Sequence, residues 1–272
     1  MSRVVEIDYV VSLDYAAISS SIVQRFGVKA ANLALARLAG LPVLPGLVLT
    51  TDAVKIFVDE RHPDHRMVTT SWLAKTSELA GQFNGRLVVS STSPLEDGAD
   101  TSLTGFCTFV VDVSGGAAIH EATTEVIESA GRDEMAVLTQ PMVEPLISGV
   151  LFGIDPVSGD ESRLLITAVN GLPEQLVSGE ATGSRYHVTR RGRVLAVDFP
   201  QEARPAILKR TTVRRLAGLA REVAREFKSP QELEWAVDQR GKLWMLGSRP
   251  VTIRAKKPSE PDVFGTVGLH PS

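Results

Sequence analysis

An acidic residue and an arginine near the end of the chain are spaced for phosphate and metal chemistry. The stretch 231–252 predicts a β-hairpin. Its parts are a strand at 233–237, a turn at 238–241 and a return strand at 243–246. Glu234 lies on the opposite face of the first strand from Leu233 and Trp235, and Arg249 follows the return strand. Carboxylate oxygens hold Mg²⁺ and a guanidinium forks onto phosphate oxygens, so the pair suits a phosphate and metal site; a surface salt bridge is the alternative.

Hydrophobic periodicity and turn residues divide the rest of the chain into helices and strands. Helices are expected at 30–39, 71–83, 117–130 and 211–227. A further helix is expected that Thr51 or Asp52 caps and that ends before His62. Strands are expected at 47–50, 87–90, 109–113, 135–139, 150–154, 164–169, 185–189 and 194–199. The mixture predicts an α+β protein whose two lobes meet near Gln140.

The composition of the 272 residues is that of an ordinary globular protein, with a net charge of −3. No apolar run approaches the ~20 residues that cross a bilayer, and the first residues lack the layout of a signal peptide. Cys107 is the only cysteine, which excludes a disulfide framework and a thiolate metal cluster. We therefore expect a cytoplasmic protein that binds neither nucleic acid nor a membrane.

Several stretches resemble, in the same order, the nucleotide-binding domain of phosphoenolpyruvate synthase, pyruvate phosphate dikinase and rifampin phosphotransferase. They are Lys29-Ala30-Ala31-Asn32-Leu33 with 41–46, the loop 91–105, Gln140-Pro141-Met142-Val143 with 148–156, the stretch 171–179, and the hairpin. This resemblance implies an ATP-grasp fold, with ATP held between two α+β lobes. The expected domains are an N-terminal lobe at 1–139, a C-terminal lobe at 140–254, and a linker or disordered tail at 255–272.

The resemblance also implies roles for individual residues. Lys29 would reach the ATP phosphates, Glu234 would bind Mg²⁺, and Arg249 would meet the charge of the transferring phosphoryl group. The expected ATP-binding residues further include the phosphate loop, the hinge between the lobes that contacts adenine, and the acid of the 171–179 stretch. These are Thr101, Ser102, Thr104 and Gly105 in the loop, Gln140, Met142 and Val143 in the hinge, and Glu174.

The chain departs from the family pattern at positions that matter for catalysis. Ser90 stands where the family has an arginine that touches the phosphates, and Arg86 is ~13 Å away along the strand, too far to replace it. Gly247 replaces a glutamine that helps to hold the metal, and Phe106 alters the end of the phosphate loop. The family's phosphohistidine domain and substrate domain are also missing from this sequence, which suggests a separate carrier or substrate-domain protein as partner.

Three functions remain open on these residues. The first is an ATP-dependent phosphotransferase component that binds Mg-ATP and passes a phosphoryl group to a partner histidine or a small molecule. The second is a degenerate pseudoenzyme that serves as a binding or scaffold protein, which Ser90, Phe106 and Gly247 favour. The third and weaker alternative is a ligase that forms an acyl phosphate, as other ATP-grasp proteins do.

Overall fold

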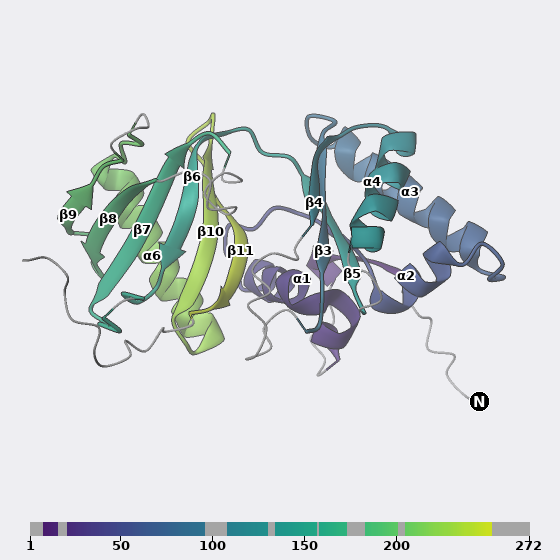
Figure 1. Ribbon diagram of the computed structural model, residues 1–272, viewed down its shortest axis with the longest axis horizontal. Coiled ribbons are helices and arrows are strands. Elements are labelled where there is room, and N and C mark those ends of the chain that lie inside the picture. The colour runs from purple at the N-terminus through teal and green to yellow at the C-terminus, as the bar shows by residue number, and fades with distance from the viewer. Residues whose placement is uncertain are drawn as a thin grey trace, which may run out of the picture.

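Two antiparallel sheets, each with its own helices, form the body of the protein (Figure 1). The computed structural model describes residues 8–15, 21–95, 108–129, 134–156, 158–172, 183–200 and 205–251. The two sheets with their helices confirm the α+β prediction. The proposed boundary at residue 140 stays a prediction, and the tail at 255–272 lies outside the described residues.

The N-terminal lobe is built on a five-stranded sheet in the order β1-β2-β5-β3-β4. Its strands are β1 (Val10–Ser12), β2 (Leu47–Leu49), β3 (Leu87–Thr92), β4 (Phe109–Val113) and β5 (Ala136–Pro141), and a 3₁₀ turn, η1 (Leu13–Tyr15), follows β1. The helices α2 (Thr51–Val58), α3 (His65–Gly81) and α4 (Gly116–Ser129) cover one face of this sheet. Their apolar side chains, with Trp72 at the centre, form one core cluster with that face.

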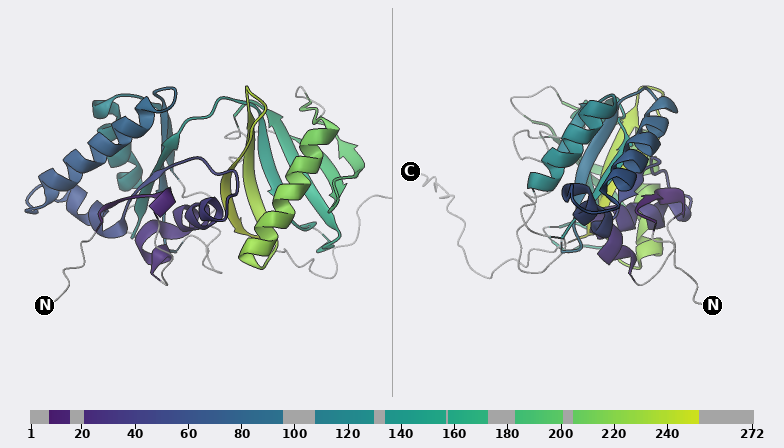
Figure 2. Two further views of the ribbon diagram at one scale, coloured as in Figure 1. Left: turned by 180° about the vertical axis from the view of Figure 1, so that it is seen from behind. Right: turned by 90° about the vertical axis from the view of Figure 1, so that its right-hand side faces the viewer.

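The C-terminal lobe is built on a six-stranded sheet in the order β11-β10-β6-β7-β8-β9. Its strands are β6 (Pro145–Phe152), β7 (Arg163–Asn170), β8 (Ser184–Thr189), β9 (Val194–Asp198), β10 (Gln231–Asp238) and β11 (Leu243–Pro250). The single helix α6 (Arg210–Phe227) lies across the back of the sheet, as Figure 2 shows from behind. We call the face opposite α6 the open face.

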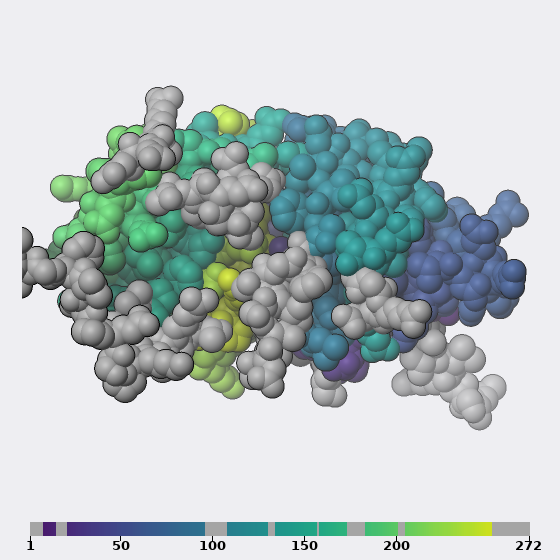
Figure 3. All heavy atoms as spheres, in the orientation of Figure 1, coloured from purple at the N-terminus to yellow at the C-terminus, as the bar shows by residue number. Residues whose placement is uncertain are grey.

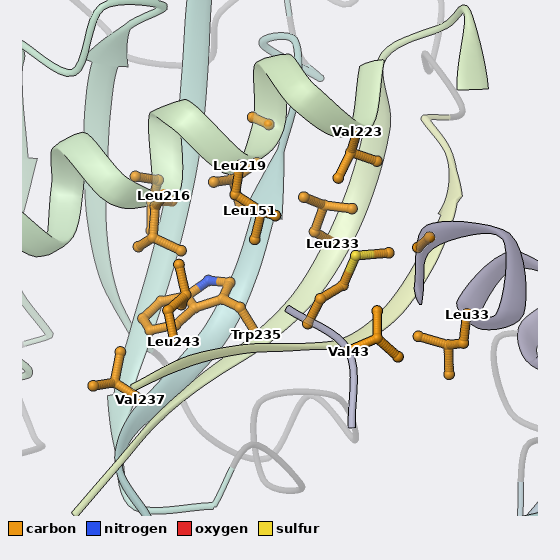
Figure 4. Packing of buried hydrophobic residues seen from close by; sticks show 14 of the residues in the cluster. Leu33, Val43, Leu151, Leu216, Leu219, Val223, Leu233, Trp235, Val237 and Leu243 are labelled. Carbon is orange, nitrogen blue, oxygen red and sulfur yellow. The ribbon is translucent and has the colours of Figure 1, made fainter. Parts of the chain in front are cut away.

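Helix α1 (Ile22–Leu38) joins the two lobes. Its buried side chains belong to the same core cluster as α6 and the six-stranded sheet, and this cluster also takes in Leu138 of β5. Figure 4 shows Leu33 of α1 beside Val43, next to the packed side chains of β10 and α6. The backbone N–H of Met245 donates to Pro42, so the segment after α1 also covers the outer edge of β11.

Cross-strand register places side chains of the open face in two rows. Residues directly opposite each other in an antiparallel pair point to the same side. One row runs Gly247, Glu234, Val150, Thr167, Arg185, Asp198, and the next runs Arg249, Glu232, Phe152, Leu165, His187. The intervening residues, such as Leu233 and Trp235, are fully buried against α6. The sheet thus has an apolar back and a largely polar front.

Some predicted boundaries were wrong for identifiable reasons. Helix α3 begins at His65 rather than at residue 71, because Val68 and Trp72 already supply a buried face. The cap of α2 is Thr50, whose hydroxyl accepts from the N–H of Ala53 at 3.3 Å, rather than Thr51 or Asp52. Strand β6 begins at Pro145, five residues before the expected strand, and so includes Ser148 and Gly149. Among the described residues no helix is long and apolar enough to span a bilayer.

Candidate nucleotide site

A bulge in the hairpin sets which side chains reach the open face. Trp235 pairs with Met245, and Glu234 pairs with Gly247, so Leu246 is an extra residue on β11. Simple alternation from Met245, which is buried in the core, would turn Gly247 toward the core as well. The extra residue reverses the alternation of sides along β11. Gly247, and Arg249 two residues later, therefore point to the same face of the sheet as Glu234.

Two ion pairs lie at this end of the open face. The Nζ of Lys29 is 3.5 Å from Oε2 of Glu234, across 205 residues of sequence. The side chains of Lys29 and Glu234 are 23% and 36% exposed. The guanidinium of Arg249 donates to Glu232 at 2.5 Å. Lys29, Glu234 and Arg249, which the sequence analysis singled out, thus come from distant parts of the chain to one corner of the sheet.

Local contacts of α1 place Lys29 in this position. Gly27 has a φ of +73°, and a Cβ there would lie 2.4 Å from the backbone of Thr92, so only glycine allows the approach. The N–H of Val28 donates to the backbone oxygen of Ser93, and the N–H of Ala30 donates to the hydroxyl of Thr92. These two hydrogen bonds hold the part of α1 that follows the kink at Gly27 against the end of β3.

A second contact fixes the other side of the same helix. The amide of Asn32 donates to the backbone oxygen of Ser248 on β11 at 2.9 Å. Since Asn32 is three residues after Lys29, both side chains leave the same side of the helix toward the hairpin. The helix is therefore attached to both lobes, and the ammonium of Lys29 has a defined direction.

Gly247 leaves the space that the carboxylate of Glu234 occupies. A Cβ at Gly247 would lie 2.8 Å from Oε2 and 3.1 Å from Cδ of Glu234. The family resemblance marks this glycine only as a missing metal ligand. The structure adds a second consequence, because a side chain here would push the carboxylate of Glu234 from its place beside Lys29.

The expected hinge is held by the N-terminal lobe. The side-chain amide of Gln140 is buried and donates to Leu44, and the N–H of Met142 donates to Arg86. The carbonyl of Met142 accepts from the amide of Asn84 at 3.3 Å. Within the part of the chain that the structure describes, the backbone N–H of Val143 has no hydrogen-bond partner. Among the residues of the expected hinge, Val143 is thus the one whose backbone N–H is open toward the described part of the chain.

Charged groups flank the hinge on the outside. Arg86 makes ion pairs with Asp112 of β4 and with Glu144, which follows the expected hinge. The hydrogen bond from Arg86 holds the pKa of Asp112 below its ordinary value, and Asp112 in turn raises the pKa of Arg86. Arg86 is therefore engaged by these two carboxylates; that it does not replace the arginine that the family resemblance implies at position 90 stays a prediction.

The turn of the hairpin carries a carboxylate with an altered pKa. Burial acts to raise the pKa of Asp238, but hydrogen bonds from Trp244, Lys242 and Arg240 outweigh it and lower the pKa. The indole N–H of Trp244 donates at 2.9 Å and the backbone N–H of Lys242 at 2.8 Å. Asp238 thereby closes the turn that presents Glu234 and Arg249 on paired strands.

Comparison with known proteins gives the site its context. Residues 70–263 match the family described as the pyruvate phosphate dikinase AMP/ATP-binding domain. The chain belongs to this family. Together with the two sheets and their helices, this membership confirms the two-lobed ATP-grasp fold class.

Relatives of the dikinase AMP/ATP-binding family cover most of the chain. The prodigiosin synthesizing transferase PigC of Serratia marcescens is 27% identical over 85% of the chain and 32% of its own length. The phosphoenolpyruvate synthase of Aeropyrum pernix is 25% identical over 89% of the chain and 42% of its own length. The rifampicin phosphotransferase of Streptomyces sviceus is 28% identical over 94% of the chain and 38% of its own length. The chain thus spans less than half of each of these relatives.

The substituted family position Ser90 lies on the side of the sheet that faces α1. Ser90 is buried, pairs with Leu138, and its hydroxyl donates to the carbonyl of Leu138 at 3.4 Å. Leu138 belongs to the core cluster that contains α1. A hydroxyl committed to the sheet therefore takes the position where the family places a guanidinium.

Several expected site residues cannot be placed. Thr101, Ser102, Thr104 and Gly105 of the phosphate loop, and Glu174, lie outside the described residues. Their roles remain predictions from the family resemblance.

Sequence reasoning missed two residues of this corner. Glu232 is two residues before Glu234 and so shares its face of β10. The alternation of side chains along a strand would have been enough to find it. Asn32 stands in the quoted stretch 29–33, but its contact with Ser248 depends on how the lobes pack and has no local signal.

Proposed function

We propose that this chain binds Mg-ATP where its two lobes meet and passes a phosphoryl group onward within a phosphotransferase of the phosphoenolpyruvate synthase kind. The acceptor would be a histidine of a separate carrier protein or a small molecule. The observation that carries the proposal is the 3.5 Å contact between Nζ of Lys29 and Oε2 of Glu234. Arg249 lies in the adjacent row of the same face. The printed names of the relatives, a phosphoenolpyruvate synthase and a rifampicin phosphotransferase among them, support the reaction class.

The donor set suits a magnesium ion held mainly by its substrate. Among the described residues no group of three acidic, histidine or cysteine side chains is arranged to hold a metal ion by itself. Mg²⁺ bound with a nucleotide commonly takes one or two carboxylates, phosphate oxygens and several waters. Glu234 supplies one carboxylate, which occupies the space over Gly247. Glu234 would hold the ion, whose positive charge would offset the negative charge of the phosphates.

The remaining residues would bind and orient the triphosphate. Lys29 would turn from Glu234 to the phosphate oxygens, because a partly exposed ion pair is worth only ~0–1 kcal/mol and is easily exchanged. Arg249 can offer a planar fork to the same phosphates. The backbone N–H of Val143 is available for the adenine edge. Lys29 and Arg249 would thus bind the phosphates, and Val143 would bind the adenine.

A binding protein without chemistry is the second candidate, and Ser90 favours it. Loss of one positioned donor to a transition state costs ~3–4 kcal/mol, or several hundredfold in rate. The carbonyl of Leu138 holds the hydroxyl of Ser90, and Arg86 is engaged by Asp112 and Glu144. The chain would then keep the nucleotide site and use it for recognition.

Calorimetry with Mg-ATP tests the nucleotide site. The wild-type chain should bind in the micromolar to submillimolar range, and Glu234→Gln should bind at least ~10-fold more weakly, a loss of ~1.4 kcal/mol. Glu226→Gln is the matched control, because it removes an exposed acid from α6 on the other side of the sheet. No binding heat at millimolar nucleotide would overturn the proposal.

Phosphoryl transfer separates the two candidates once binding is established. If the chain consumes ATP with a carrier protein or a small acceptor, and Glu234→Gln abolishes this turnover, the binding-protein reading is wrong. If nucleotide binds tightly and no acceptor from a broad panel supports turnover, the phosphotransferase reading is wrong.

A further inference from the structure

The far end of the open face contains a hollow that the nucleotide site does not use. Its volume is about 640 Å³, within the range of small-molecule sites. Side chains of four neighbouring strands and the turn after β6 line it. The lining residues are Phe152, Asp155, Pro156, Ser158, Leu165, Thr167, Arg185, His187 and Asp198. Figure 3 shows this face, with the yellow surface of the hairpin between the teal and green strands and the N-terminal lobe.

Strand register separates the hollow from the triphosphate corner. Arg185 lies in the same row as Glu234 but three strands away, a separation of ~14 Å at ~4.8 Å a strand. Val150 and Thr167 stand between them in that row. The hinge precedes β6, whereas Phe152 ends it. The hollow is therefore at the opposite end of β6 from the expected adenine position.

The charged groups of the hollow are unequally satisfied. The imidazole of His187 pairs with Asp198 at 3.2 Å, and Asp155 accepts a hydrogen bond from the backbone of Ser158 in its turn. Arg185 faces the same space and has no hydrogen bond or ion pair to any described residue. By contrast, Arg163 on the adjacent strand pairs with Asp160 at 3.0 Å. The guanidinium of Arg185 thus makes no direct contact with a carboxylate of the described residues, although Asp198 stands opposite it and pairs with His187.

The floor of the hollow is apolar. Phe152 and Leu165 are directly paired across β6 and β7, and both remain only half-buried. Beside them Thr167 presents a hydroxyl in the row of Arg185. An aromatic or aliphatic body can cover this floor, while a guanidinium takes a carboxylate through two parallel hydrogen bonds. The two features lie in adjacent rows and can bind one molecule.

We propose that this hollow is a second ligand site, for a small organic carboxylate with an apolar or aromatic body. Arg185 binds the carboxylate, Phe152 and Leu165 contact the body, and Thr167 offers a hydroxyl to a polar substituent. The proposal stands apart from the nucleotide function, because binding here requires neither Mg²⁺ nor ATP.

The test uses 4-fluorobenzoate as probe, without nucleotide, and follows the fluorine resonance and the assigned backbone amides. Wild-type chain should bind saturably at millimolar concentrations or below, with shifts at 165–167 and 185–187. The neutral 4-fluorobenzamide should bind at least ~10-fold more weakly, since it lacks the charge that Arg185 recognises.

Variants assign the binding to the hollow. Arg185→Gln should weaken 4-fluorobenzoate at least ~10-fold, and Arg185→Lys, which keeps the charge but loses the fork, should fall between. Arg214→Gln is the matched control, because it removes an exposed arginine from α6 behind the same sheet and should bind like the wild type.

Four results would overturn the proposal. They are absence of saturable binding by the wild-type chain, equal binding of the amide, unchanged binding in Arg185→Gln, and binding of inorganic phosphate in place of the benzoate. Because every titration omits nucleotide, a failure here says nothing against the Mg-ATP site, and a failure of Mg-ATP binding leaves this result standing.

Discussion

The two ends of the open face differ in how their charges are balanced. At the hairpin end each of the two cations has a carboxylate beside it, Lys29 with Glu234 and Arg249 with Glu232. At the far end Arg185 makes no hydrogen bond or ion pair to a described residue, and Asp198, which stands directly opposite it, pairs with His187. Both ends belong to one sheet and share the same two rows of side chains.

This difference indicates which kind of ligand each end can accept. A nucleotide with its metal brings both positive and negative charge, and it can exchange with both partners of an existing ion pair. A carboxylate brings only negative charge, so it needs a cation that is not already neutralised. We therefore expect Mg-ATP at the paired corner and an organic anion in the hollow.

Substitution at Gly149 should damage both ends together and gives the largest effect. A Cβ there would lie 1.9 Å from the carbonyl oxygen of Thr167, so β6 and β7 would have to separate. We expect Gly149→Ala to lower the free energy of unfolding by ~3 kcal/mol or more, measured by urea denaturation. Gly116→Ala, where a Cβ meets nothing within 4 Å, is the control and should be close to neutral.

Substitution at Lys29 should affect the hairpin end alone. We expect Lys29→Met to weaken Mg-ATP binding ~10- to 100-fold, since charged hydrogen bonds contribute ~1.5–3 kcal/mol. Its unfolding free energy should change by less than ~1 kcal/mol, because the ion pair with Glu234 is partly exposed. Calorimetry and urea denaturation measure the two quantities. A stability loss as large as the binding loss would mean that Lys29 serves the fold.

A side chain at Gly247 tests whether the place of the Glu234 carboxylate matters. Gly247→Ala should displace that carboxylate, which is flexible and 36% exposed, and weaken Mg-ATP binding ~3- to 10-fold. Binding of 4-fluorobenzoate at the far end should stay unchanged. Tighter Mg-ATP binding in the variant would show that the present position of Glu234 is not the binding position.

The hairpin turn should give a small effect that depends on pH. The folded-state pKa of Asp238 lies below its unfolded value of ~3.9, so its stabilisation is present above that pH and is lost as the pH falls through the folded pKa. Asp238→Asn should therefore lower the free energy of unfolding by ~1 kcal/mol at neutral pH. Below neutral pH the stability of the variant should fall less steeply than that of the wild type. Thermal unfolding between pH 3 and 7 measures both, with Glu128→Gln on α4 as the control.

Much of the fold could be predicted because local patterns and tertiary packing agree. Strand β4 matches its predicted range, and the hairpin and α6 match within a few residues, since their apolar residues recur with the period of the element. The start of β6 was missed because Ser148 and Gly149 have low strand propensity. Gly149 is there because the backbone of β7 comes too close for a side chain.

For the candidate site, the sequence pointed to individual residues but not to their arrangement. Family resemblance pointed to Lys29, Glu234 and Arg249, and the structure brings these three to one corner of the sheet. The bulge at Leu246 determines that Arg249 pairs with Glu232 and that Gly247 faces the same side of the sheet as Glu234. No spacing in the sequence reveals this bulge. The hollow around Arg185 depends on the register of four strands and has no local signal.

A crystal structure of the chain with Mg²⁺ and a non-hydrolysable ATP analogue tests the central claim most directly. The account predicts a metal ion at ~2.0–2.1 Å from a carboxylate oxygen of Glu234, with phosphate oxygens contacted by Lys29 and Arg249. A nucleotide bound elsewhere, with the contact between Lys29 and Glu234 still closed at 3.5 Å, would contradict it.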